Sequence, residues 1–215
     1  IVPGYNGEHQ TLVDFLKEAK KIGFPVILKA TAGGGGKGMQ LVHEEREFTW
    51  AFEAAKRNAK GAFGQDALLL EKYFTTIKHI EVQVLADSYG KVIHLFERDC
   101  SVQRRHQKII EETPASGLDS KIRDQITGAA VSIAKSVQYL GAGTVEFIFD
   151  PMTQNFYFLE MNTRIQVEHP ITEEVTGIDL VEWQLRIACG EPLTIQQEDV
   201  KQNGHSIECR LYAED

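Results

Sequence analysis

The sequence has few cysteines and little positive charge, and these shortages exclude several classes of protein. Cys100, Cys189 and Cys209 form no C-x-x-C pair, which argues against a zinc site or a disulfide scaffold. The formal net charge of -8 disfavours a general binder of nucleic acid or anionic membranes. There is no signal peptide and no long apolar span. We therefore expect a cytoplasmic or mitochondrial-matrix protein that binds neither nucleic acid nor membrane.

What the chain does contain is a regular alternation of helical and strand patterns. Its 215 residues are 42% hydrophobic, enough for one large domain or two smaller ones. The patterns predict an α+β fold with a small unit at 1–74 and a larger one at 75–215. Since it starts at Ile1 and stops in strand-like sequence, we expect a piece of a longer polypeptide. Helices are predicted at 8–23, 45–60, 120–141 and 179–192, and strands at 24–30, 38–42, 66–74, 79–87, 91–99, 144–150 and 155–162.

Four consecutive glycines, Gly33–Gly36, follow the apolar segment 24–30. A Walker A loop does not fit, because Lys37 precedes a glycine where Ser or Thr is required. A Rossmann turn does not fit either, because the strand-like segment 38–42 stands where a helix should begin. We interpret the segment as a flap whose backbone N–H groups wrap phosphates, with Lys29 as an added charge. A plain glycine-rich hairpin is the alternative.

Two glutamates are predicted to face each other across a strand pair. A five-residue loop after Asp150 would place that residue opposite Phe156, and counting back places Glu146 opposite Glu160. Like charges at such positions destabilise a sheet, so the pair favours a bound cation. Asn162 projects to the same side, and carboxylate and amide oxygens suit Mg²⁺ or Mn²⁺. A slipped register that separates the two charges is the alternative.

Polar residues continue the row beyond this strand pair. If the chain stays extended, Arg164, Gln166 and Glu168 project to the side of Glu160, and Pro170 ends the row. Arg164 offers a planar fork for a small oxyanion, and Glu168 is a candidate base.

A basic cluster lies in "ERDCSVQRRHQK", just after a strand that is expected to be buried. A solvated or salt-bridged surface would explain it, but phosphate chemistry also needs positive charge beside a metal and a flap. Its members are Arg98, Arg104, Arg105, His106 and Lys108.

Together these segments resemble the ATP-grasp family, and within it the biotin carboxylase component of biotin-dependent acyl-CoA carboxylases. The resemblance is carried by "KATAGGGGKGM", "QRRHQK", "GAGTVEFIFD" and "EMNTRIQVEHP" and covers nearly the whole chain. It implies an ATP-dependent ligase in which ATP and bicarbonate form carboxyphosphate, which then carboxylates biotin. The biotin would be held on a carrier domain outside this chain. A carboxyltransferase component would be a further partner, and the parent enzyme would be oligomeric.

The resemblance also implies roles for individual residues. Glu168 would deprotonate bicarbonate, and Arg210 would stabilise the biotin enolate. The implied bicarbonate ligands are Lys108, Arg164, Gln166 and the backbone of Val167, and the implied metal ligands are Glu146, Glu160 and Asn162. The implied ATP-binding residues are Lys29, Gly35, Gly36, Glu71, Lys72, Phe74, His79, His106, Glu146 and Glu160.

The chain departs from the family at both ends. Family members have a subdomain before the flap, which supplies another phosphate-binding lysine, and they continue past the last residue here. The resemblance therefore implies the lid subdomain plus part of the C-terminal biotin carboxylase subdomain. We expect this piece alone to bind ATP weakly and to turn it over negligibly. The alternatives are another ATP-grasp ligase of the carboxylate–amine or carbamoyl-phosphate type, and an inactive nucleotide-binding fragment.

Overall fold

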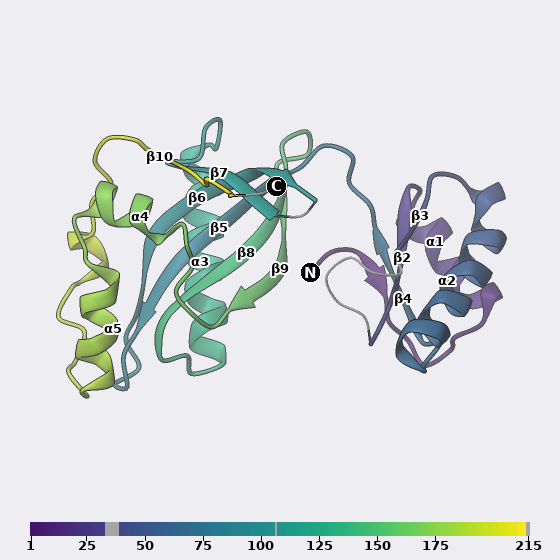
Figure 1. Ribbon diagram of the computed structural model, residues 1–215, viewed down its shortest axis with the longest axis horizontal. Helices are drawn as coiled ribbons and strands as arrows, with labels where there is room; N and C mark the ends of the chain where they lie inside the picture. The colour runs from purple at the N-terminus through teal and green to yellow at the C-terminus, as the bar shows by residue number, and fades with distance from the viewer. Residues whose placement is uncertain (33–38, 106, 214–215) are drawn as a thin grey trace. The chain divides into compact units, whose positions relative to one another are not determined.

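The computed structural model describes residues 1–32, 39–105 and 107–213. The chain divides into two compact units, residues 1–75 and 76–215, each with its own sheet and its own core (Figure 1). Gly35, Gly36 and His106, which the sequence assigned to the nucleotide site, lie outside the described residues. Within the described residues, no helix combines the length and the apolar character needed to cross a membrane.

The first unit is a four-stranded antiparallel sheet with both helices on one side (Figure 1). Phe15, Phe48 and Phe52 on the helices pack against Leu28 and Leu70 of the sheet. The strand expected after the glycine run is confirmed, since β3 pairs with β2 in a hairpin. The elements are β1 (Gly4–Tyr5), α1 (Leu12–Ile22), β2 (Val26–Ala30), β3 (Gln40–Val42), the 3-10 helix η1 (Glu45–Glu47), α2 (Phe48–Phe63) and β4 (Leu68–Lys72), with strand order β1-β4-β2-β3.

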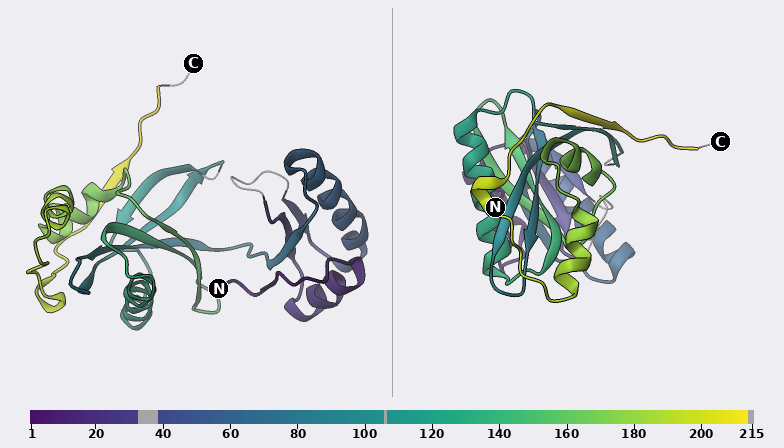
Figure 2. Two further views of the ribbon diagram at one scale, coloured as in Figure 1. Left: turned by 90° about the horizontal axis from the view of Figure 1, so that it is seen from below. Right: turned by 90° about the vertical axis from the view of Figure 1, so that its left-hand side faces the viewer.

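The second unit is a six-stranded antiparallel sheet between two helical layers (Figure 2). Helix α3 covers one face, and α4 and α5 lie on the other. The elements are β5 (Lys78–Ala86), β6 (Val92–Arg104), β7 (Gln107–Thr113), α3 (Ser120–Ser136), β8 (Gly141–Asp150), β9 (Asn155–Asn162), α4 (His169–Thr176), α5 (Leu180–Ala188), the 3-10 helix η2 (Gln197–Asp199) and β10 (Ser206–Cys209). The strand order is β10-β7-β6-β5-β8-β9.

The central strand β5 shows how this sheet creates a polar interior. Ile80, Val82 and Val84 point to one face and join the core beneath α3. The alternate residues Glu81 and Gln83 point to the other face and are nevertheless fully buried. Because successive side chains of a strand alternate between faces, one face of β5 holds apolar packing and the other holds buried polar groups.

The β8–β9 pair corrects part of the predicted register. Asp150 pairs with Asn155, not with Phe156, so the loop is one residue shorter than expected. The register then shifts by one residue between Glu146 and Phe147, a β-bulge that adds an unpaired residue to β9. That bulge restores the pairing of Glu146 with Glu160, and this part of the prediction is confirmed.

The polar row beyond β9 is not extended, which contradicts the sequence expectation. The strand ends at Asn162, and the chain turns so that Glu168 becomes the residue immediately before α4. Pro170 occupies the first turn of that helix instead of ending a strand. A proline fits there because the first N–H groups of a helix have no partner inside the helix.

Candidate active site

Buried charged side chains gather on the face of the second sheet that α3 does not cover. Glu81 and Arg98 are fully buried, and Glu146 and Glu168 are 4% and 1% exposed. With their ion-pair partners they come from the four strands β5 to β8, from the turn before α4 and from the residue after β10, so distant parts of the chain meet here. We call this set the buried charge cluster: Glu81, Arg98, Lys108, Glu111, Glu146, Glu168 and Arg210.

Lys108 lies among three carboxylates. Its Nζ is 2.9 Å from Glu146 Oε1 and 2.7 Å from Glu168 Oε1, and it also contacts Glu81 Oε2. Burial alone would lower the pKa of Lys108, but the surrounding negative charges, Glu81 foremost, outweigh it and raise the pKa. Burial would likewise raise the pKa of Glu81, yet Arg98 and Lys108 lower it to about 2. The ammonium group is therefore firmly charged.

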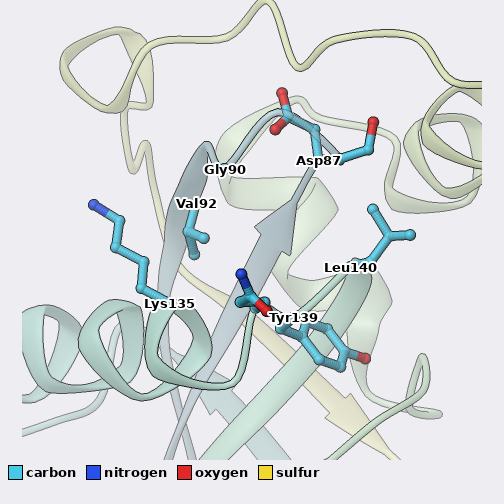
Figure 3. Close-up of a pocket in the computed structure, with 8 residues that line it drawn as sticks. Asp87, Gly90, Val92, Lys135, Tyr139 and Leu140 are labelled. Atoms are coloured by element: carbon cyan, nitrogen blue, oxygen red, sulfur yellow. The ribbon is translucent and has the colours of Figure 1, made fainter.

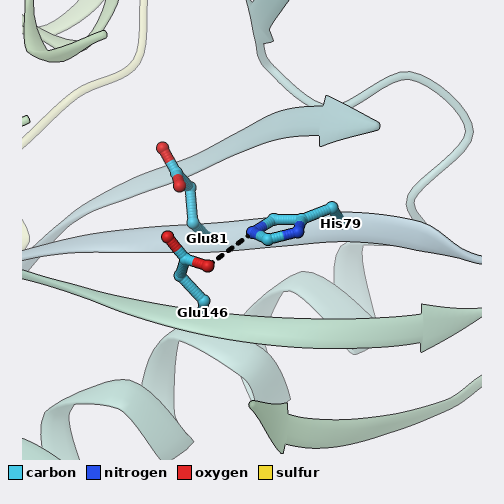
Figure 4. A group of neighbouring side chains, drawn as sticks. All are labelled: His79, Glu81 and Glu146. Carbon is cyan, nitrogen blue, oxygen red and sulfur yellow. Dashed lines mark ion pairs between the residues drawn. The ribbon is translucent and has the colours of Figure 1, made fainter. Parts of the chain in front are cut away.

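Glu146 accepts hydrogen bonds from several nitrogen groups at once. Its Oε1 accepts from Lys108, from Asn162 Nδ2 at 2.8 Å and from Gln166 Nε2 at 3.2 Å. Its Oε2 is 2.8 Å from His79 Nε2 (Figure 4). Burial opposes ionisation of Glu146, but the bond from His79 and the charge of Lys108 bring its pKa down to about 2. Asn162, predicted to offer its oxygen on the side of the two glutamates, thus contacts Glu146 through its nitrogen.

Glu168 joins the lysine to an arginine. One of its oxygens contacts Lys108, and Oε2 accepts from Arg210 Nη2 at 2.8 Å. Arg210 also donates through Nε to Glu111 Oε1 at 2.7 Å. Burial would lower the pKa of Arg210, but Glu111 and Glu168 raise it. The candidate base thus sits between the two cations that the resemblance assigns to bicarbonate and biotin.

Other predicted residues lie outside this cluster. Arg164 is exposed and donates to the backbone oxygen of Ile165 at 3.1 Å, while Val167 is 60% exposed. The basic run of the sequence divides: Arg98 is buried and Lys108 is partly buried, both in ion pairs, whereas Arg104 and Arg105 are exposed.

The first unit holds the remaining predicted nucleotide residues. Lys29 of β2 forms an ion pair with Glu71 of the neighbouring strand β4. Lys72 donates to the backbone oxygens of Gly23 and Phe24 at 2.9 and 3.0 Å. Phe74 follows β4 by two residues.

Among the described residues, several groups of side chains could hold a metal ion, including Glu81, Cys100 and Glu168, whose two carboxylates both contact Lys108. Glu146 and the exposed Glu160 are cross-strand partners, and their carboxylates fit the oxygen ligands that Mg²⁺ or Mn²⁺ prefers. A second set, His79, Glu81 and Glu146, has ligand atoms within 4.8 Å of one another (Figure 4). Lys108 contacts both of its carboxylates, so an ammonium group already stands where that cation would. The residues therefore fit a metal at the pair of glutamates better than at the second set.

Sequence reasoning missed Glu81, Gln83 and Glu111. In "HIEVQV" the polar residues alternate with apolar ones, a pattern that is equally typical of a strand with one face in water. Their burial depends on α4 and on β7, and neither element was predicted. The sequence therefore carried no separate signal for them.

A cavity of about 490 Å³ lies apart from the buried charge cluster (Figure 3). None of the described residues to which a site role was assigned lines it. It is formed by the β5–β6 turn and the end of α3, with Asp87, Ser88, Gly90, Val92, Lys135, Gln138, Tyr139 and Leu140 as its lining.

Comparison with known proteins gives consistent results. The family described as the carbamoyl-phosphate synthase L chain, ATP binding domain, matches residues 1–196. The chain is 57% identical over 215 residues to methylcrotonoyl-CoA carboxylase subunit alpha, mitochondrial, of Mus musculus, covering 100% of this chain and 30% of that protein.

Two solved structures agree with this result. The biotin carboxylase–β,γ-ATP complex from Campylobacter jejuni has a TM-score of 0.88 and 51% identity, covering 100% of this chain and 48% of that one. The biotin carboxylase domain dimer of Hydrogenobacter thermophilus 2-oxoglutarate carboxylase, with MgADP, ADP and bicarbonate, has a TM-score of 0.85 and 53% identity, covering 97% and 46%. This chain thus spans 30% of the mouse protein and about half of each solved chain. It belongs to the family of the carbamoyl-phosphate synthase L chain, ATP binding domain, and has the α+β, ATP-grasp fold of the biotin carboxylase structures.

Proposed function

We propose that this chain carries the site for ATP- and bicarbonate-dependent carboxylation of biotin by way of carboxyphosphate, the first half-reaction of an acyl-CoA carboxylase. The observation that carries the proposal is the contact of Glu168 with both Lys108 and Arg210. These three residues are the base, a bicarbonate ligand and the biotin ligand that the resemblance implies. The bicarbonate in the related Hydrogenobacter structure supports the same substrate class.

The chemistry follows from the positions of the charges. Bicarbonate is a poor nucleophile until its proton is removed, and Glu168 is the carboxylate beside the cations that would hold the anion. A bound bicarbonate competes with Glu168 for the ammonium of Lys108, which frees a carboxylate oxygen to accept the proton. Arg210 then holds the enolate oxygen of biotin through its guanidinium fork. Preorganised charges of this kind need no reorganisation as the reaction proceeds.

Each unit holds residues that we propose to be nucleotide or metal ligands. Lys29 would contact the ATP phosphates, and Glu71 and Lys72 would lie at the adenine hinge. Glu146 and Glu160 would hold Mg²⁺ or Mn²⁺, and the bound metal would neutralise part of the phosphate charge. On this proposal the first unit is the ATP-grasp lid and the second is part of the C-terminal subdomain.

The partners follow from the same reaction. We propose a biotin carrier domain, a carboxyltransferase component and an oligomeric parent enzyme. The dimer named for the Hydrogenobacter structure supports the last of these. The proposed location is the cytoplasm or the mitochondrial matrix, the latter supported by the name of the mouse relative.

The test measures ATP hydrolysis that depends on biotin and bicarbonate in the complete gene product. We expect Glu168→Gln and Arg210→Ala each to reduce this rate at least about 100-fold, because loss of a base or of an oxyanion donor typically costs that much. ATP affinity should stay within about threefold. Arg186→Ala on α5 is the control and should change neither quantity, because it removes only surface ion pairs with Glu182 and Glu191 and a contact with the ring of Trp183.

A variant that lost ATP binding yet kept its turnover at saturating nucleotide would contradict the proposal, because its residue would then belong to the nucleotide site. A second candidate, a carbamoyl-phosphate-type ligase, is favoured by the description of the matching family. It predicts that ammonia, and not biotin, stimulates the bicarbonate-dependent hydrolysis of ATP.

A further inference from the structure

Arg98 has no assigned role in the proposed reaction, yet it is a fully buried cation of the cluster. It projects from β6 and is paired with Glu81, whose nearer oxygen is 2.6 Å from Arg98 Nε. The remaining N–H groups of the guanidinium donate to four neutral side chains. These bonds run from Nη1 to Gln83 Oε1 and Thr172 Oγ1, both at 2.9 Å, and from Nη2 to Thr144 Oγ1 and Gln166 Oε1, both at 3.4 Å.

These five bonds use the whole donor set of an arginine. A guanidinium has five N–H groups in one rigid plane, whereas a lysine has three donors on a flexible stem. The acceptors come from β5, from β8, from the turn after β9 and from α4. Arg98 therefore ties the turn and the helix to the centre of the sheet, and it has no donor left for a ligand.

The bond from Arg98 decides which way the amide of Gln166 faces. The oxygen of that amide accepts from Arg98, so its nitrogen is directed to Glu146 Oε1. Gln83 is oriented in the same way, since its oxygen accepts from Arg98 and its nitrogen donates to Gly143 O at 2.9 Å. Without this cation either amide could turn over, because the two ends of an amide differ little in shape.

Arg98 also affects Lys108 through a shared carboxylate. One oxygen of Glu81 contacts Arg98 and the other contacts Lys108. If Arg98 were absent, the full charge of Glu81 would attract Lys108. The lysine would then be drawn away from Glu146 and Glu168, where the proposed anion binds.

We propose that Arg98 is a positioning residue for the bicarbonate-activating turn, residues 163–168. Arg98 orients the amide of Gln166 and, through Thr172, holds α4, the helix that begins after Glu168. It also neutralises part of the charge of Glu81, so that Lys108 faces the anion site. This assignment rests on the proposed function and deepens it, because Arg98 acts on bicarbonate activation and not on the nucleotide.

The kinetic test compares Arg98→Lys with Arg123→Lys in the complete gene product. Arg123 is the matched control, because its Nε also binds a buried carboxylate, Glu97, at 2.8 Å but lies outside the cluster. We expect Arg98→Lys to lower kcat/KM for bicarbonate at least about tenfold, since a displacement of about 1 Å in positioning groups can cost about 100-fold. The KM for ATP should stay within about threefold, and Arg123→Lys should alter neither constant.

Thr172→Val provides a milder variant in case Arg98→Lys does not fold. It removes one acceptor while keeping the side-chain shape, and we expect the same selective loss for bicarbonate at about threefold. Folded variants with an unchanged dependence on bicarbonate, or with equal losses for ATP and bicarbonate, would overturn the proposal.

A second measurement does not depend on activity. Hydrogen exchange in the segment 163–172 should become at least about threefold faster in Arg98→Lys and Thr172→Val, and should not change in Arg123→Lys. Unchanged exchange in both cluster variants would overturn the positioning role. If the wild-type enzyme shows no bicarbonate-dependent ATP hydrolysis, the proposed function fails, whereas faster exchange would still support the physical role of Arg98.

Discussion

Replacing Lys108 with methionine should destabilise the second unit in a way that depends on pH. The substitution removes the ammonium group but keeps much of the apolar stem. In the variant, Glu81 keeps Arg98 and Glu168 keeps Arg210. Glu146 loses the lysine that contacts it and keeps His79, Asn162 and Gln166. Removing one partner from a buried ion pair costs about 3–5 kcal/mol, and because two of the three carboxylates keep a cation we expect about 3 kcal/mol at pH 8.

The pH dependence follows from the pKa of Glu146. In the wild type that pKa is lowered from 4.5 to about 2, so its stabilising contribution is complete above 4.5 and is lost as the pH falls toward 2. In the variant the bond from His79 remains but the charge of Lys108 is gone, so the folded-state pKa of Glu146 rises from its wild-type value. The folded variant then gains a proton at a higher pH than the folded wild type does. The destabilisation at pH 3 should therefore be smaller than at pH 8, by about 1.4 kcal/mol for each unit by which the new pKa exceeds 3.

Urea unfolding followed by tryptophan fluorescence at pH 8 and pH 3 measures this effect. Trp183 is buried in the second unit and 7% exposed, so a Trp50→Phe background makes the signal report that unit. Lys21→Met removes an exposed pair with Glu18 and should cost less than about 1 kcal/mol at either pH. A loss below about 1 kcal/mol for Lys108→Met at pH 8, or equal losses at both pH values, would refute the reasoning.

Three further outcomes are expected. Lys29→Met should weaken ATP binding about tenfold or more in calorimetry, since a charge-assisted contact contributes about 1.5–3 kcal/mol, and an unchanged Kd would contradict that role. Glu160→Gln should raise the Mg²⁺ concentration needed for half-maximal ATP turnover at least about tenfold if this residue is a metal ligand. Gly143→Ala should lower the free energy of unfolding by about 1–3 kcal/mol, because its Cβ would lie 2.7 Å from the ring of Tyr139. Gly61→Ala on α2 meets open space and should be neutral or stabilising, so equal losses in both alanine variants would contradict the clash.

Local patterns were sufficient to predict most elements of the fold. Apolar spacing located α1, α2, α3 and α5, and alternation located the hairpins β5–β6 and β8–β9. The prediction that Glu146 faces Glu160 is confirmed although the loop is one residue shorter than predicted, because the bulge in β9 offsets the difference. A bulge depends on backbone pairing between two strands, so neither strand alone indicates it.

The turn before α4 shows the limit of such patterns. The alternation in "TRIQVEHP" suits a strand that ends at Pro170. In the folded chain the same proline begins a helix, and packing of α4 against the sheet outweighs the local preference. Gln166 and Glu168 are buried in one network all the same, because the turn directs both toward the charge cluster.

Residue patterns alone were enough to predict the strand and helix periods, the strand after the glycine run, the facing glutamates and the resemblance to biotin carboxylases. They did not show which charges of the run Arg98–Lys108 become buried, or which carboxylates pair with them, because both depend on how distant segments pack in the folded chain. The physical reason is that alternation specifies to which face a side chain points, but not what covers that face. Here α4, β7 and the residue after β10 cover it, and their ion pairs make burial of the charges possible.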